Sequence, residues 1–230
     1  MIFIYSGEVP ALDRRLSYEL GVNHRLLTIP FAAEECWAAL ESRDYFRACG
    51  LNAQALSKLA CNDKAQLRNE IFTSDAVYLS GGNTYQFLAF AKEVGLFSLL
   101  QAFESLGGII VAESAGSIIL SSDISTAAIP TTCPDENSVG ITDFQAMGRL
   151  SFHVSPHYKP DAPQAKDEME ELQALANLSN TPILILQDGA GIVVQGDEVI
   201  FSTGSPAWLS PTNEQPLAID TQTATHSLAS

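Results

Sequence analysis

The chain has 230 residues, of which 46% are hydrophobic, and its formal net charge is −15. This length and hydrophobic content suit one α/β domain with a sizeable core, so we expect a single domain over residues 1–230. The strong negative charge argues against partners that attract basic patches, namely nucleic acid and anionic membrane surfaces.

Short apolar runs alternate with longer helical patterns along the chain, which is typical of a mostly parallel sheet with helices on both faces. The first run, Ile2–Tyr5, lacks the length and the basic residues of a signal sequence, so it is predicted to be a core strand. The other predicted strands are Arg25–Ile29, Ala76–Leu79, Ile109–Ala112, Leu150–Val154, Ile183–Leu186, Gly191–Val194 and Val199–Phe201. The predicted helices are Ala33–Cys49, Asp63–Phe72, Thr84–Ala91, Phe97–Ser105, Ala115–Ser121 and Gln164–Ala176.

The last two predicted strands are joined by Gln195–Glu198, a turn that predicts a C-terminal hairpin. Residues 125–143 form a polar, proline-bearing segment with little periodicity, and long irregular segments of this kind are usually functional or mobile. The tail after about residue 213 is polar and is expected to be peripheral.

The four cysteines are scattered, without a CxxC pair or histidines at zinc-ligand spacing; they are Cys36, Cys49, Cys61 and Cys133. This usage favours a reduced, cytoplasmic protein without a metal site. No apolar segment approaches the ~20 residues that cross a bilayer, so no membrane contact is expected. The amino-acid sequence does not distinguish a monomer from a homodimer.

An apolar run that stops at Ser114 is the most informative pattern in the chain. Residues 109–120 read IIVAESAGSIIL, which is typical of a nucleophile elbow, a strained turn between a strand and a helix. Ala112, Ala115 and Gly116 supply the small neighbours, although Ala112 replaces the first glycine of the Gly-x-Ser-x-Gly pattern. A helix beginning at Ala115 would aim free N–H groups at an oxyanion beside Ser114. A plain strand followed by a helix with a capping serine would look similar.

The predicted strand at Ala76–Leu79 is followed by Gly81 and Gly82, just before a predicted helix. Glycines at the carboxyl end of a strand let a ligand approach the backbone, and open α/β sheets bind ligands at this edge. Neither a dinucleotide fingerprint nor a Walker-type motif is present. An oxyanion-hole or substrate loop is therefore favoured over a purely structural turn.

Two further residues end predicted strands. His157 follows Pro156 and is the preferred general base; His153, inside the strand, is second and fits a buried core histidine equally well. Asp188 ends a strongly apolar strand before a glycine, where an ordinary turn aspartate would look the same. The order of Ser114, His157 and Asp188 along the chain does not test a catalytic triad, because triads recur in every order.

Together these motifs resemble the peptidase E and cyanophycinase family of serine peptidases. The match rests on Gly81–Gln86, Glu113–Gly116, Pro156–Tyr158 and Gln187–Ala190, and order and spacing fit as far as about Leu209. The resemblance implies a flavodoxin-like, three-layer α/β sandwich related to class I glutamine amidotransferases. It also implies exopeptidase or dipeptidase activity on short peptides by a serine–histidine–acid triad, without metal or organic cofactor.

The resemblance assigns roles to six residues. They are Ser114 as the nucleophile, His157 as the general base, Asp188 as the acid, the Gly82 and Ala115 amides as the oxyanion hole, and Asn83 as a substrate contact.

Two departures from the family pattern bear on activity. The family acid is usually glutamate, so the shorter Asp188 needs a backbone closer to His157. In the family's aspartyl dipeptidases, an arginine-containing segment after the histidine neutralises the substrate's aspartate, whereas no arginine follows Arg149 here. Lys159 or Lys166 would act only as point charges, without the bidentate fork of arginine, so strict aspartyl specificity is not expected.

Two alternatives to a peptidase stay open, namely a small-ester carboxylesterase and a catalytically silent binding protein on the same fold.

Overall fold

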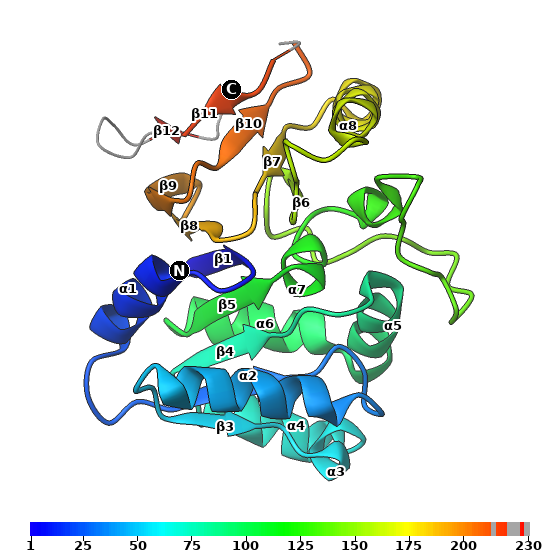
Figure 1. Cartoon of the computed structure of the whole chain (residues 1–230). Helices are drawn as coiled ribbons and strands as arrows, with labels where there is room; N and C mark the ends of the chain where they lie inside the picture. The colour runs from blue at the N-terminus through cyan, green and yellow to red at the C-terminus, as the bar shows by residue number, and fades with distance from the viewer. Residues whose placement is uncertain (213–214, 220–225, 228–230) are drawn as a thin grey trace.

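The computed structural model has a larger and a smaller β-sheet (Figure 1), and it describes residues 1–212, 215–219 and 226–227. Within these residues the larger sheet has eight strands in the order β12-β9-β8-β1-β5-β4-β2-β3, and the smaller has four in the order β11-β10-β7-β6. The strands of the larger sheet are β1 (Ile2–Ser6), β2 (Leu26–Ile29), β3 (Ala53–Ala55), β4 (Ala76–Leu79), β5 (Ile109–Glu113), β8 (Ala190–Gln195), β9 (Glu198–Thr203) and β12 (His226–Ser227).

The centre of the larger sheet is parallel. Strand β1 pairs in parallel with β5, β5 with β4, β4 with β2 and β2 with β3, whereas β8 joins β1 in the antiparallel sense. The predicted central, mostly parallel sheet is therefore confirmed. Because the strands are parallel, the carboxyl ends of β1, β4 and β5 meet at one edge, where ligands bind in open α/β sheets.

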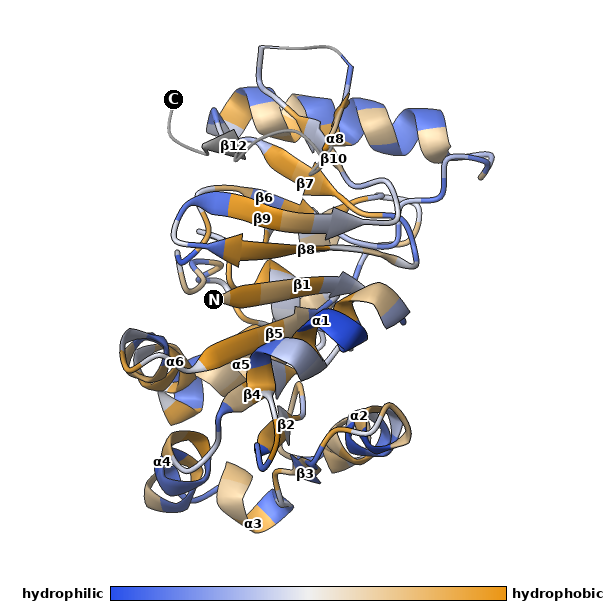
Figure 2. Ribbon diagram, turned by 90° about the vertical axis from the view of Figure 1, so that its left-hand side faces the viewer, coloured by the Kyte–Doolittle hydropathy of each residue, from blue (hydrophilic) through white to orange (hydrophobic). Residues whose placement is uncertain are grey.

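Helices cover both faces of the larger sheet (Figure 2). Alternate residues of β1 point to opposite faces, as the strand period requires. Ile2 and Ile4 belong to the core on the face that carries α4 and α6, while Phe3 and Tyr5 pack in the second core with α1 and α2. The helices are α1 (Pro10–Leu20), α2 (Cys36–Ala48), α3 (Lys58–Cys61), α4 (Lys64–Phe72), α5 (Thr84–Val94), α6 (Leu96–Ser105), α7 (Ala115–Ile118), α8 (Ala165–Ser179) and the 3-10 helix η1 (Ser125–Ala128).

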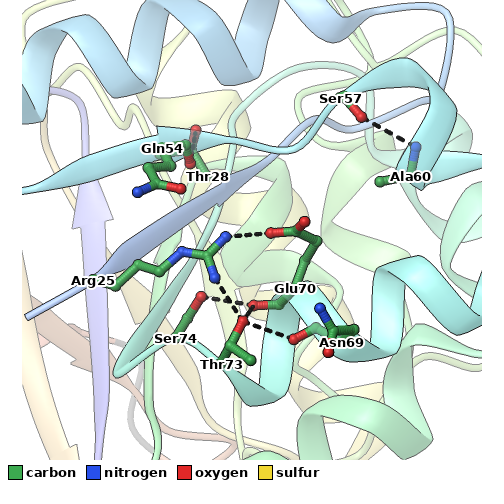
Figure 3. A network of polar contacts seen from close by, with 9 residues as sticks. All are labelled: Arg25, Thr28, Gln54, Ser57, Ala60, Asn69, Glu70, Thr73 and Ser74. Atoms are coloured by element: carbon green, nitrogen blue, oxygen red, sulfur yellow. Dashed lines mark hydrogen bonds and ion pairs between the residues drawn. The ribbon is translucent and has the colours of Figure 1, made fainter.

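Polar side chains fix the ends of several helices. Asp63 caps α4 by accepting the N–H groups of Ala65 and Gln66. At the other end of α4, the guanidinium of Arg25, just before β2, bonds the Glu70 carboxylate and the Thr73 hydroxyl (Figure 3). This network ties the last turn of α4 to the start of β2.

The smaller sheet contains β6 (His153–Ser155), β7 (Ile183–Ile185), β10 (Ala207–Leu209) and β11 (Leu217–Ala218). Strands β6 and β7 are parallel, and β10 is antiparallel to β7. Helix α8 covers this sheet by packing Leu172 and Ala176 against Ile183, Ile185 and Leu209. The sequence predicted one sheet, but the predicted strands that correspond to β6 and β7 belong to this second sheet.

The predicted strand Leu150–Val154 is wrong at its start, since only His153–Ser155 is extended. The Met147 N–H donates to Ile119 O, and the Arg149 and Leu150 N–H groups both donate to Leu120 O. These bonds hold the backbone before β6 against the chain after α7, so that it cannot join a strand ladder.

Other differences are local. Helix α7 has four residues rather than the predicted seven, Ala115–Ser121. Helix α1, which was not predicted, begins with Pro10 at a position that tolerates proline, and it buries Leu12 and Leu16 one turn apart. Among the described helices, none combines the length and the apolar character that crossing a membrane requires.

Candidate active site

Ser114 occupies the turn between β5 and α7 with φ 48° and ψ −117°. A positive φ is unfavourable for a non-glycine residue, so the surrounding contacts must hold the turn. The N–H and hydroxyl of Ser117 both donate to Ser114 O, at 2.9 and 2.6 Å. A Cβ on Gly116 would lie 2.4 Å from Leu79 O, so only glycine lets α7 approach β4 this closely.

The structure brings Ser114, His157 and Asp188 together. His157 Nε2 lies 2.9 Å from Ser114 Oγ, and His157 Nδ1 lies 2.5 Å from Asp188 Oδ1. Ser114 follows β5 of the larger sheet, whereas His157 and Asp188 follow β6 and β7 of the smaller one. The site therefore lies where the carboxyl ends of strands from both sheets meet.

Ser6, at the end of β1, fixes both loops from the smaller sheet. Its hydroxyl accepts the His157 N–H at 2.9 Å, and its carbonyl accepts the Gly189 N–H at 2.8 Å. Ser6 is fully buried, and His157 has a φ of 62°, so the corner depends on this support. The sequence interpretation missed Ser6; its signal is a polar residue at the carboxyl end of an apolar strand.

The glycine loop after β4 lies against Ser114. A Cβ on Gly81 would be 3.4 Å from Ser114 Cβ, and one on Gly82 would be 2.1 Å from the Phe31 ring. Gly82 also has a φ of 137°, which favours glycine. Among the described residues, the N–H groups of Gly82 and Ala115 have no acceptor, so both remain able to bind an anionic oxygen.

The side chain of Asn83 has a structural role. Its oxygen accepts the Gln86 N–H and caps α5, while its amide nitrogen donates to Glu136 O. Asp135 accepts the Thr84 N–H at 2.8 Å. The irregular segment 125–143 is thereby tied to the start of α5, and the substrate contact expected of Asn83 stays a prediction.

A cavity of about 220 Å³ lies beside Ser114 and His157. The segment 125–143 lines one side of it with Thr126, Ile129 and Asp135, and the first turn of α8 contributes Glu168. Glu168 is 6% exposed, and burial is the main cause that raises the pKa of its carboxyl. The sequence interpretation did not single out Glu168, because its spacing in α8 is that of an ordinary helical residue.

His153, the second candidate for a general base, lies apart from this constellation. It is 1% exposed, and its Nδ1 is 3.9 Å from Asp123 Oδ1. Burial lowers the pKa of its imidazole, and Asp123 opposes this shift. His153 thus fits the buried core histidine that the sequence left open.

Within the described residues, no group of three or more His, Cys, Asp or Glu side chains is arranged to hold a metal ion. The four cysteines are unpaired.

A strained serine linked through an imidazole to a carboxylate, at the carboxyl edge of an α/β sheet, defines the class of serine hydrolases. The comparisons with known proteins narrow this class. The family model described as Peptidase family S51 matches residues 5–202, so the chain belongs to that family of serine peptidases. The resemblance to peptidase E is thereby confirmed.

Curated relatives agree with this assignment. The uncharacterised Listeria monocytogenes peptidase Lmo0363 is 27% identical over 172 residues, which are 75% of this chain and 78% of the relative. Peptidase E of Salmonella arizonae is 23% identical over 89% of this chain and 88% of its own length. A Drosophila melanogaster protein described as a probable α-aspartyl dipeptidase is 25% identical, covering 69% of this chain and 64% of its own.

Two solved structures share the fold. A Listeria monocytogenes protein described as a candidate peptidase E has a TM-score of 0.68 at 22% identity, covering 88% of this chain and 96% of its own. A peptidase from an acI-B1 Actinobacterium has a TM-score of 0.70 at 16% identity, covering 98% and 96%.

Proposed function

We propose that the protein is a serine exopeptidase or dipeptidase that hydrolyses short peptides through Ser114, His157 and Asp188. The observation that carries this proposal is the continuous contact from Asp188 Oδ1 to His157 Nδ1 at 2.5 Å and from His157 Nε2 to Ser114 Oγ at 2.9 Å. The names of the relatives, Peptidase E and α-aspartyl dipeptidase, favour short peptides as substrates.

In this mechanism, the strained turn of a nucleophile elbow presents Ser114 Oγ to the scissile carbonyl. His157 accepts the hydroxyl proton as Oγ attacks, and Asp188 holds the imidazole in the required tautomer. The N–H groups of Gly82 and Ala115 stabilise the oxyanion, each worth about 10²–10³ in rate by analogy with known donors. His157 then protonates the leaving amine, and water releases the acyl group. Because α7 has only four residues, its dipole adds little to the stabilisation that the Ala115 N–H provides.

A backbone hydrogen bond supports a competent acid despite the short side chain of Asp188. The Gly189 N–H bond to Ser6 O draws the Asp188 loop toward β1, so that the aspartate reaches His157. The contact between His157 Nε2 and Ser114 Oγ favours an active enzyme over the silent binding protein, in which the imidazole would not need to lie near Oγ.

The segment 125–143, which is tied to the start of α5, bounds the cavity and favours short substrates over long chains.

The decisive experiment is a dipeptide-library hydrolysis screen with the Ser114→Ala variant as the blank. We expect the wild-type protein to release amino acids and to react with a fluorophosphonate probe, and we expect Ser114→Ala to do neither while keeping its circular dichroism spectrum. A parallel series of p-nitrophenyl esters tests the carboxylesterase alternative. Full activity of Ser114→Ala, or turnover of esters without any dipeptide, would refute the proposal.

A further inference from the structure

Glu168 is a buried carboxylate without a partner in the cavity beside Ser114. It is the fourth residue of α8, 6% exposed, and among the described residues its carboxylate has no hydrogen bond or ion pair. A buried charged group normally has a partner, because removing it from water is costly. Burial and, to a smaller extent, the neighbouring Glu171 both raise the pKa of the Glu168 carboxyl, as expected for a charge without a close cationic partner.

A second polar group in the same cavity also lacks a partner. Thr126 is 3% exposed, and within the described part of the chain its hydroxyl has no hydrogen bond. Thr126 and Glu168 both line the cavity that contains Ser114 and His157. The Thr126 oxygen is closed off from the cavity surface, so it cannot neutralise the Glu168 charge from the ligand side, and the Glu168 carboxylate is the acceptor that the cavity offers to a ligand.

The remaining walls decide the shape of that ligand. Ile118, Ala127, Ile129 and Pro130 give the cavity an aliphatic side. Lysine and arginine side chains combine an apolar stem with a cationic head, which suits an aliphatic wall beside a carboxylate. Lys159 also lines the cavity, but it is exposed and, within the described residues, forms no ion pair with Glu168.

We propose that Glu168 binds a cationic nitrogen of the peptide substrate and makes the site selective for cationic peptides. This inference rests on the proposed function, since it names the substrate class of the same site. In a short peptide the cation is either a lysine or arginine side chain or the α-ammonium group, and the aliphatic wall favours the side chain. Such a preference is opposite in charge to that of an aspartyl dipeptidase.

The test is a binding experiment that does not depend on turnover. Calorimetry on the Ser114→Ala protein compares Lys-Ala and Ala-Lys with the matched norleucine dipeptides, which keep the stem and lack the cation. We expect a lysine dipeptide to bind about 10–100-fold more tightly than its norleucine match, as a charged hydrogen bond implies. Nα-acetylated forms of each peptide identify the α-ammonium group if it is the source.

Variants on α8, made in the Ser114→Ala protein, test whether Glu168 causes the preference for the cationic peptide. Glu168→Gln should reduce this preference to less than about 3-fold, whereas Glu168→Asp should retain part of it. Glu170→Gln is the matched control, because Glu170 is exposed on the same helix and pairs with Lys166. Equal binding of cationic and neutral forms, a preference that survives Glu168→Gln, or no binding of any dipeptide would each overturn the inference.

The same peptides separate this inference from the proposed function. If the Ser114→Ala protein binds cations through Glu168 while the wild-type protein hydrolyses none of them, the peptidase proposal fails and the cation site stands. If the wild-type protein hydrolyses neutral dipeptides as fast as cationic ones, the peptidase stands and the cation site fails.

Discussion

Ser6 shows how one buried hydroxyl can organise a site without touching the reacting atoms. It accepts the His157 N–H through Oγ and the Gly189 N–H through its carbonyl, so a residue of β1 holds the two loops that follow β6 and β7. The position of β1 therefore fixes where the side chains carried by these two loops, His157 and Asp188, can lie. Small displacements at such a site reduce rates strongly, because catalysis requires close alignment.

We therefore expect Ser6→Ala to lower kcat about 10-fold with little change in KM, because the His157 corner loses one of its hydrogen bonds. Steady-state kinetics on the best dipeptide measures this split. Ser121→Ala is the matched control, since Ser121 is also fully buried but its hydroxyl has no partner among the described residues. Equal kcat values for the two variants would remove Ser6 from the positioning of His157.

The pKa of Glu168 makes a prediction about stability. Because burial raises this pKa in the folded state, protonation favours folding, and the contribution is complete below the unfolded pKa of about 4.3. This contribution to stability is lost as the pH rises through the pKa that Glu168 has in the folded protein. Glu168→Gln should therefore raise the free energy of unfolding at pH 7 by about 1 kcal/mol, and the gain should disappear near pH 4.

Urea unfolding of both proteins from pH 4 to pH 8 checks this prediction. The titratable and charged groups around the carboxylate are Glu171 on α8, Tyr158, and three residues that line the same cavity, Asp135, His157 and the exposed Lys159. Glu170→Gln should show no such pH dependence, and a constant difference between wild type and Glu168→Gln at all pH values would contradict the explanation.

At the scale of elements, α7 packs closely against the backbone of β4. Gly116 lies where a Cβ would be 2.4 Å from Leu79 O and 2.8 Å from Leu79 Cβ. The obstacle is partly backbone, which cannot move without disturbing the β4 pairings with β2 and β5. The same contact fixes the distance between the serine turn and the glycine loop.

Gly116→Ala should destabilise the protein by about 3 kcal/mol, as overpacking against backbone implies. The free energy of unfolding in urea measures the loss. Gly81→Ala provides the control, since its Cβ would make an ordinary contact at 3.4 Å with Ser114 Cβ and should cost much less. Similar losses for the two variants would show that the close packing of α7 is not the cause.

At the scale of the whole molecule, the net charge of −15 gives a long-range repulsion that folding must overcome. We expect the Tm at pH 7 to rise when NaCl is increased from about 20 to about 300 mM, because salt screens this repulsion. Differential scanning calorimetry measures the slope. At pH 5, closer to the sequence pI of about 4.4, the slope should shrink, and an equal slope at both pH values would exclude self-repulsion as the cause.

The amino-acid sequence determined the features that depend on neighbours in the chain. The apolar runs marked β1, β4 and β5 within a residue or two, because a buried strand needs a continuous apolar stretch whatever lies beside it. The same runs placed Ser114, Gly82, His157 and Asp188 at strand ends, where function is concentrated in α/β folds.

Only the tertiary structure decided how these ends meet. The pairing of β6 with β7 outside the main sheet, the contact of Ser6 with His157 and the burial of Glu168 all join residues far apart in the chain. No local pattern encodes such contacts, since they depend on the register and packing of whole sheets. For that reason the reach of Asp188 to His157, doubtful from side-chain length, follows from a backbone hydrogen bond between Gly189 and β1.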